Sequence, residues 1–199
     1  MAEPETAASS AITRPVAEAG LEDNGSGLAP AEEGWFVVNV RDAQWLSSEN
    51  GEKQASGSEC YFESGKYEFS QLGIRLHVLA PGESNGLYHG ENKQEDFLVL
   101  FGECVLLVEG EERRLRAWDF VHCPPWTEHI FVGAGDGPCV ILMVGARSED
   151  WHVLYPVSEL AARYGASAAK ETSDPDQAYV GFEPSRRARP SYWDRLPWV

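Results

Sequence analysis

Residues 81–102 read PGESNGLYHGENKQEDFLVLFG. A Pro-Gly turn leads into alternating polar residues, and an apolar run of strand type then ends at Gly102. Residues two apart on an extended chain share a face, so His89 and Glu91 can point the same way and Glu95 can join them from the next strand. The stretch predicts three potential ligands that face one interior.

A second stretch, residues 118–129, reads WDFVHCPPWTEH. Its Pro-Pro turn delivers His129 to the start of a strand. Between residues 72 and 145, short apolar runs are separated by Gly, Pro and Asp, which is typical of an antiparallel sandwich or barrel. These expected strands cover 73–79, 95–101, 103–108, 112–116, 119–123, 129–132 and 139–144.

The turns and caps around these runs indicate two further features. Glu109-Gly110-Glu111 predicts a tight hairpin between two strands. A single helix is expected from Val157 to Tyr164, with Ser158 as its N-cap and Gly165 as its stop.

The two stretches together resemble the two motifs of the cupin superfamily. Glu95, followed by six residues and Gly102, fits the first motif, and Gly82 lies one residue further from the histidine than that motif asks. Pro124 and His129 fit the second motif in spacing, and Asp119 occupies its aspartate. The resemblance covers about residues 72 to 145. It implies an all-β fold, a small antiparallel barrel of jelly-roll type that is often dimeric and holds any metal inside the barrel mouth.

The metal ligands depend on how the first motif is aligned. With three residues before the glutamate, the set is His89, Glu91, Glu95 and His129, with Glu91 in place of a histidine. With four residues, Tyr88 and Gly90 fall at the histidine positions, only two ligands remain and the site is empty.

In the first alignment, two imidazoles and two carboxylates suit one divalent ion, with iron, manganese, nickel and zinc open. The alternative is that Glu91 and Glu95 are ordinary loop and edge charges and the two histidines make ordinary hydrogen bonds.

The second motif departs from the family pattern at three positions. Trp118 and Trp126 stand where it has glycines, and Gly133 stands where it has Asn. Because a tryptophan does not easily take a positive φ, the turn before His129 is expected to differ in shape.

Several further side chains are expected near a pocket. Tyr88, Phe97 and Trp126 are aromatic residues that either stack on a ligand or fill the core, and Trp126 is expected at the pocket rim. His77 and His122 lie in strands and either faces the cavity or makes ordinary hydrogen bonds within the barrel. His152 is expected at the surface.

Composition sets the domain organisation. With 199 residues, 43% of them hydrophobic, the chain can bury one core but hardly two. Residues 1–34 carry seven acids against one arginine and no aromatic residue, which predicts a disordered leader. Order is expected from Trp35, whose run to Val40 is rich in β-formers, and residues 35–155 form the barrel. Residues 156–199 add the helix and a basic, aromatic tail that packs on the barrel or on a second subunit.

Charge and cysteines narrow the classes of function. A net charge of −16 opposes binding to nucleic acids and anionic membranes. Four cysteines without a C-x-x-C pair predict reduced, buried thiols, and a cytoplasmic location is expected since neither a signal peptide nor a membrane-spanning run is present.

The resemblance implies a metal-dependent oxygenase or oxidoreductase that acts on a small oxygen-bearing molecule and forms a homodimer. The alternatives are a non-catalytic module that senses a small molecule or a metal, and a scaffold whose barrel is plugged by its own side chains.

Overall fold

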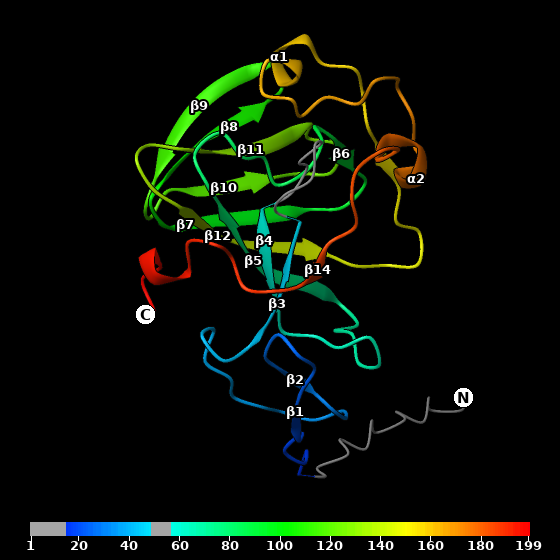
Figure 1. Cartoon of the computed structure of the whole chain (residues 1–199). Coiled ribbons are helices and arrows are strands. Elements are labelled where there is room, and N and C mark those ends of the chain that lie inside the picture. Colours follow the sequence, from blue (N-terminus) through cyan, green and yellow to red (C-terminus); the bar gives the residue numbers. More distant parts are fainter. Residues whose placement is uncertain (1–14, 49–56) are drawn as a thin grey trace, which may run out of the picture.

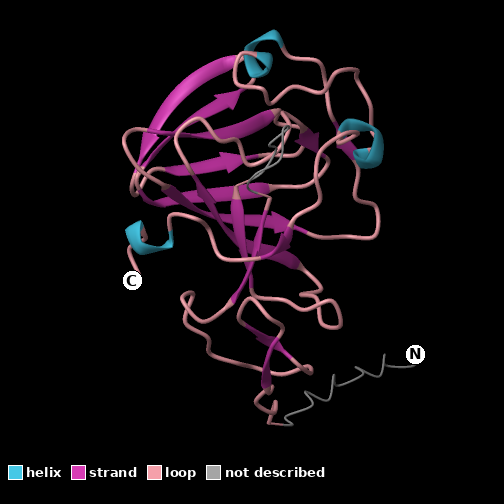
Figure 2. Cartoon of the chain, viewed as in Figure 1, coloured by secondary structure: helices cyan, strands magenta, loops and turns pink. Residues whose placement is uncertain are grey.

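The computed structural model describes residues 15–48 and 57–199, and its described residues form mostly antiparallel strands (Figures 1 and 2). The strands are β1 (Leu21–Asp23), β2 (Leu28–Pro30), β3 (Gln44–Ser47), β4 (Ser58–Tyr61), β5 (Leu72–Leu79), β6 (Gly90–Glu91), β7 (Glu95–Phe101), β8 (Glu103–Val108), β9 (Glu111–Arg116), β10 (Phe120–Cys123), β11 (His129–Ala134), β12 (Cys139–Ala146), β13 (Val153–Leu154) and β14 (Arg186–Arg187). The helical segments are α1 (Glu159–Ala162), α2 (Pro175–Ala178) and the short 3₁₀ helix η1 (Trp193–Arg195).

Two sheets make the body of the molecule. The larger has the strand order β10-β7-β12-β5-β4-β3-β14, and the smaller has the order β11-β8-β9. Their facing sides bury one apolar cluster, made by Leu79, Phe97, Val99, Cys104, Leu106, Cys123, Phe131, Cys139 and Ile141. This two-layer, antiparallel arrangement confirms the expected jelly-roll class.

The predicted strands between residues 72 and 145 all form, and β7 and β8 have the expected bounds. Glu109 and Gly110 link β8 to β9 with φ of 49° and 76°, the positive pair that a tight hairpin requires. Helix α1 is shorter than expected, but Ser158 caps it by accepting a hydrogen bond from the Ala161 amide, and Gly165 follows with φ 69°.

The outer face of the large sheet is covered by the C-terminal tail. Trp45 is fully buried there, and its ring centroid lies 5.4 Å from that of Trp193 and 5.6 Å from that of Trp198. Leu196 is 4% exposed and belongs to the same cluster as Leu76 and others from β5 and β12. The tail therefore packs on the barrel of its own chain.

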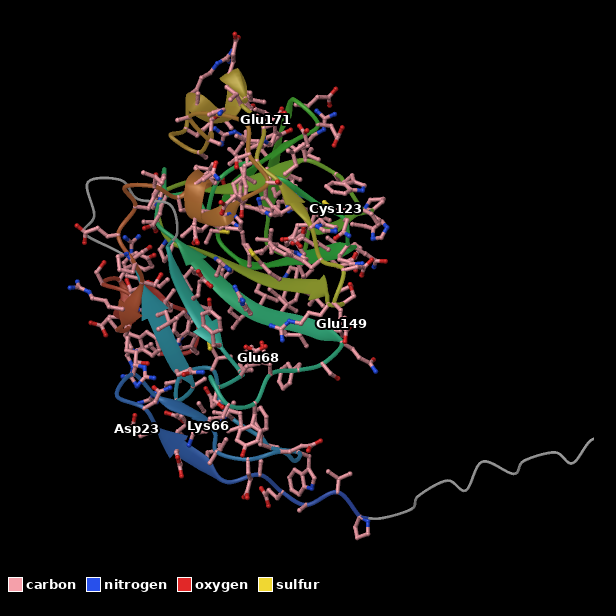
Figure 3. All side chains as sticks on the ribbon, turned by 90° about the vertical axis from the view of Figure 1, so that its right-hand side faces the viewer. Asp23, Lys66, Glu68, Cys123, Glu149 and Glu171 are labelled. Atoms are coloured by element: carbon pink, nitrogen blue, oxygen red, sulfur yellow. The ribbon has the colours of Figure 1, made fainter. Side chains whose placement is uncertain are left out.

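The structure differs from the expected leader over residues 15–34. Strands β1 and β2 pair here, and the Leu28 amide donates to the Asp42 carbonyl. Backbone hydrogen bonds thus order a segment that has little apolar surface. Amino-acid composition does not reveal such bonds, so it predicted disorder here. Residues 1–14 lie outside the described residues. Asp23 of β1 lies at the end of the molecule opposite Glu171 (Figure 3).

The run from Trp35 to Val40 does not form a strand; only Trp35 makes an isolated bridge, with Glu18. Val38 and Val40 instead pack against the cluster around Trp45. The apolar residues of this run are used for side-chain packing rather than for sheet pairing. Within the described residues, no helix is long and apolar enough to cross a membrane.

The turns at Trp118 and Trp126 correct a second expectation. Trp118 has φ 78° and Trp126 has φ 69°, so both adopt the left-handed conformation that the glycines of the motif would take. Trp118 and Trp126 are 75% and 52% exposed, so their rings project largely into solvent and do not have to pack in the core. The turn before His129 therefore takes a positive φ despite the tryptophan, at a cost in strain.

Candidate metal centre

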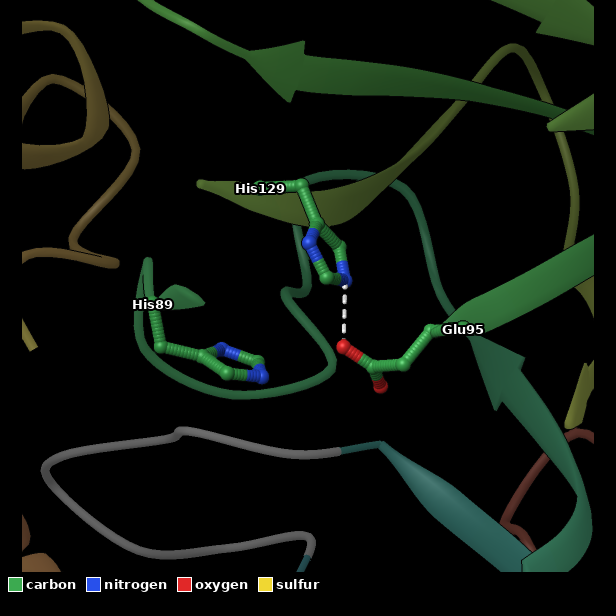
Figure 4. A group of neighbouring side chains, drawn as sticks. All are labelled: His89, Glu95 and His129. Atoms are coloured by element: carbon green, nitrogen blue, oxygen red, sulfur yellow. Dashed lines mark ion pairs between the residues drawn. The ribbon is translucent and has the colours of Figure 1, made fainter. Parts of the chain in front are cut away.

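Three side chains meet at one end of the space between the sheets (Figure 4). His89 precedes β6, Glu95 opens β7 and His129 opens β11. One ligand atom from each lies within 4.8 Å of the other two. The backbones of His89 and His129 pair as an antiparallel bridge, with N to O distances of 3.2 and 2.8 Å, which fixes the two imidazoles side by side.

Both imidazoles are oriented by backbone carbonyls. His89 Nδ1 lies 2.7 Å from the Leu87 oxygen, and His129 Nδ1 lies 3.0 Å from the Thr127 oxygen. A carbonyl only accepts, so each Nδ1 carries the proton and each Nε2 keeps its lone pair. His129 Nε2 lies 3.6 Å from Glu95 Oε2, which places that lone pair beside the carboxyl group (Figure 4).

Burial shifts the titration of all three groups toward the neutral forms. Burial, with a contribution from His89, lowers the pKa of His129 to about 3, against the Thr127 carbonyl. Burial also lowers the pKa of His89, against the Leu87 carbonyl and the Glu91 carboxylate. Burial and the nearby Glu91 raise the pKa of Glu95 to about 8. The site therefore presents two neutral imidazoles and a carboxyl group that a cation would deprotonate.

Glu91 is close to these three residues without joining their group. Its Oε1 lies 3.9 Å from His89 Nε2, and its Oε2 accepts a hydrogen bond of 2.8 Å from the indole of Trp151. The carboxylate is thus held at the edge of the site by a residue of the loop after β12. Its role as a fourth ligand stays a prediction.

The three residues open onto a cavity of about 580 Å³, a size that accommodates a small molecule. Of the residues expected at a pocket, Phe97 and His77 line this cavity. The sequence did not indicate several other polar lining residues: Glu59, Arg75, Asn85, Arg147, Trp151 and Tyr179. Alternation could have revealed Arg75, because it shares a strand face with His77 and the core residue Leu79.

Three other expected pocket residues lie elsewhere. Tyr88 is buried in a separate cluster and accepts a hydrogen bond from the Gly110 amide. His122 is on the outer face of β10, because its neighbours Val121 and Cys123 face the core, and its Nδ1 lies 2.7 Å from Asp96 Oδ1. Trp126 is half-exposed and is not among the described residues that line the cavity. His152 is exposed, as expected.

Comparison with protein families identifies the class. Residues 75–145 match the family model of the cupin domain, which spans β5 to β12 and contains all three clustered residues. This match confirms the resemblance to the cupin family over this part of the chain. A comparison with curated proteins finds no match.

Solved structures with a similar fold have different descriptions. A sugar phosphate isomerase from a cupin superfamily of Silicibacter pomeroyi is 29% identical over 48% of this chain and 62% of that chain, with a TM-score of 0.43. A polyketide cyclase from Streptomyces resistomycificus is 16% identical over 58% and 89%, with a TM-score of 0.48. A Cupin 2 conserved barrel domain protein from Salinispora arenicola is 24% identical over 45% and 75%, with a TM-score of 0.40. This chain thus spans less than two thirds of the isomerase.

Proposed function

We propose that His89, Glu95 and His129 bind one divalent metal ion and that the chain is a metal-dependent enzyme of the oxygenase or oxidoreductase class. The observation that carries this proposal is the grouping of two imidazole nitrogens and one carboxylate oxygen within 4.8 Å on the wall of a cavity. Two histidines and one carboxylate on one side of an ion leave positions open on the other, as in the non-haem iron oxygenases. The expected substrate is a small oxygen-bearing molecule.

The donor set fits such an ion in charge and in orientation. The carbonyls of Leu87 and Thr127 hold the proton on Nδ1 of each histidine, so Nε2 is ready to coordinate. Glu95 supplies a negative charge, and Glu91 stands near enough to supply another. The set suits iron, manganese, nickel or zinc. When bound, the ion supplies Lewis acidity and, for iron, redox chemistry.

The chain's own residues would position the substrate and limit access of water. Phe97 forms an apolar part of the cavity wall beside His129, and the centroids of the two rings lie 5.0 Å apart. Asn85 is fixed by accepting from the Phe131 amide at 2.8 Å, which presents its amide group to the cavity. The proposed reaction space is thus polar at its ends and apolar between them.

A homodimer in the cytoplasm completes the proposal. The four cysteines are buried and unpaired, as expected of thiols in a reducing compartment. Trp118 lies just before β10 and Phe120 is its first residue, and they are 75% and 64% exposed. Because β10 is an edge strand of the large sheet, the two rings offer an apolar surface for a second copy.

The test is elemental analysis of protein purified without added metal. We expect about one ion per chain in the wild type, almost none in His129→Ala and Glu95→Ala, and an unchanged content in His152→Ala, since that histidine is exposed. Equal metal content in all four proteins would contradict the metal site. Oxygen uptake by the iron-loaded protein then separates an oxygenase from a sensing module. Metal binding without turnover of any small hydroxylated molecule supports the sensing module.

A further inference from the structure

The cavity has a second polar end, away from the histidines. Glu59 of β4 and His77 of β5 are direct partners across the two strands, and Tyr61 is the partner of Arg75. Glu59, Arg75 and His77 all line the cavity. Tyr61 supports the group from beside it, since the guanidinium of Arg75 lies 4.5 Å above its ring.

The contacts of Glu59 use only one of its two oxygens. Oε2 accepts from the Tyr61 hydroxyl at 2.6 Å and from Arg75 Nη1 at 3.5 Å, and it lies 3.6 Å from His77 Nε2. Among the described residues, Oε1 has no partner. Within the described residues, the buried side-chain atoms that lack a partner are His77 Nδ1 and Trp198 Nε1. Glu59 Oε1 also lacks a partner but is not one of these buried atoms, so it is an accessible acceptor.

Arg75 likewise keeps donors free. Within the described residues its guanidinium makes one hydrogen bond, from Nη1 to Glu59, so Nε and Nη2 are unused. Arg147, which also lines the cavity, is different: it donates to both carboxylate oxygens of Glu63, at 2.5 and 2.9 Å, and to the Phe69 carbonyl. Arg75 therefore keeps two nitrogens to donate to a ligand, whereas both terminal nitrogens of Arg147 are committed to Glu63 and Phe69.

Glu59 and Arg75 together carry no net charge. Burial raises the pKa of Glu59, but His77 and Arg75 lower it further, so the net shift is downward and the group is ionised. Glu59 thus balances the charge of Arg75, and Glu91 adds a negative charge to the same cavity. An anion would meet a carboxylate here, whereas a hydroxyl group can donate to Glu59 and accept from Arg75.

We propose that Glu59 and Arg75 bind neighbouring hydroxyl groups of an uncharged, polyhydroxylated small molecule. The placement of its other end at the histidines rests on the proposed function. Glu95 of β7 pairs with Gly145 of β12, and Gly145 pairs with Gly73 of β5. Arg75 is therefore two strands away from Glu95 and two residues further along β5 than the position level with Glu95. That offset separates the Cα atoms of Glu95 and Arg75 by about 12 Å. With both side chains extended inward, the gap suits a monosaccharide.

The test uses full-length protein loaded with zinc and ligand-observed NMR titrations. The probes are D-glucose and D-xylose, with D-gluconate and glucose 6-phosphate as anionic counterparts. We expect the neutral sugars to bind more tightly than the anions, and Glu59→Gln and Arg75→Met to weaken their binding about tenfold or more, because each loses a hydrogen bond to a charged group. Arg75 is 40% exposed, so its substitution should leave the fold intact by circular dichroism.

The matched controls are Glu68→Gln and Arg114→Met, which change exposed residues and should leave sugar binding unaltered. Tighter binding of the anions, no binding of either neutral sugar at millimolar concentration, or equal losses in the controls would overturn the proposal. Zinc content is measured in the same samples. If the wild type holds no zinc, the proposed function fails, and the same titrations on the metal-free protein decide this inference separately.

Discussion

Trp118 and Trp126 hold a backbone conformation that normally requires glycine. Hydrogen bonds keep them there: the Trp118 amide donates to the Val99 carbonyl at 2.7 Å and the Trp126 amide to the Glu91 carbonyl at 2.5 Å. The left-handed conformation costs an L-residue about 1–2 kcal/mol, because Cβ approaches the following carbonyl. Strain is therefore stored at the turn before β10 and at the turn that leads to His129.

Replacing Trp118 by glycine should release this strain. We expect Trp118→Gly to raise the free energy of unfolding by up to about 1 kcal/mol, since the relief exceeds the roughly 0.5–1 kcal/mol entropy cost of glycine. Trp118→Ala keeps Cβ and should bring no such gain, so it serves as the matched control. Urea denaturation measures both variants. A Trp118→Gly protein less stable than Trp118→Ala would show that the relief of strain is smaller than the entropy cost of glycine.

The three clustered residues could be predicted because their signal is local. The resemblance to the two cupin motifs indicated Glu95 and His129 by their spacing to a glycine and a proline, and strand parity put His89 on one face with Glu91, which the structure leaves outside the group. Glu59 could not be found this way, because its position in the cavity depends on the pairing of β4 with β5. That pairing joins segments whose connection leaves no local pattern in the sequence.

The C-terminal tail also shows that a local pattern can be read from the sequence while the partner of a long-range contact cannot. Its aromatic residues predicted packing, but the sequence left open whether on the barrel or on a second subunit. The structure places it against Trp45, and the Tyr192 hydroxyl donates to the Val78 carbonyl of β5 at 3.0 Å. The strands from β7 to β12 were predictable because each has short turns at its ends. Strands β1 and β2 were not, since backbone bonds rather than apolar residues hold them.

The tail should be needed for stability. Leu196 is 4% exposed in the cluster around Trp45, so Leu196→Ala should lower the free energy of unfolding by about 2–4 kcal/mol. Deleting residues 184–199 should lower it further, because Trp193 and Trp198 leave with the segment. Thermal melting measures the loss, with Val199→Ala as the control because Val199 is 60% exposed. An unchanged melting temperature in Leu196→Ala would contradict the packing described for the tail.

At the scale of the molecule, the sheet order builds the cavity. The order β7-β12-β5-β4 places Glu95, Met143, Arg75 and Glu59 on one inner face, although they come from segments far apart in the chain. Across that face, Met143 is the partner of both Arg75 and Phe97. The polar ends and apolar middle of the cavity are thus a product of strand order, which periodicity alone does not determine.

Metal binding should couple to pH through Glu95. Its pKa of about 8 lies above the ordinary value of 4.5, so the metal-free fold loses stability as pH rises from about 4.5 to 8, where the unfolded chain has already released this proton. His129, with a pKa of about 3, is neutral throughout the upper part of this range. A metal must displace the Glu95 proton below pH 8, and above that value the carboxylate is already free.

We therefore expect zinc affinity to rise about fivefold from pH 7 to pH 8, because the ionised fraction of Glu95 rises from about one tenth to about one half, and then to rise about twofold more before it levels off. A ligand that binds only the folded state stabilises it by RT ln(1 + [L]/Kd), so the zinc-induced rise in melting temperature should also be larger at pH 8 than at pH 7. Competition titrations with a chelator measure the affinity, and calorimetry in two buffers of different ionisation enthalpy should show about one proton released per zinc at pH 7. His152→Ala, which alters an exposed histidine, should give the same profile. An affinity that is flat between pH 7 and 8 would mean that Glu95 is already ionised in the metal-free protein, and that burial at the entrance to β7 does not control the site.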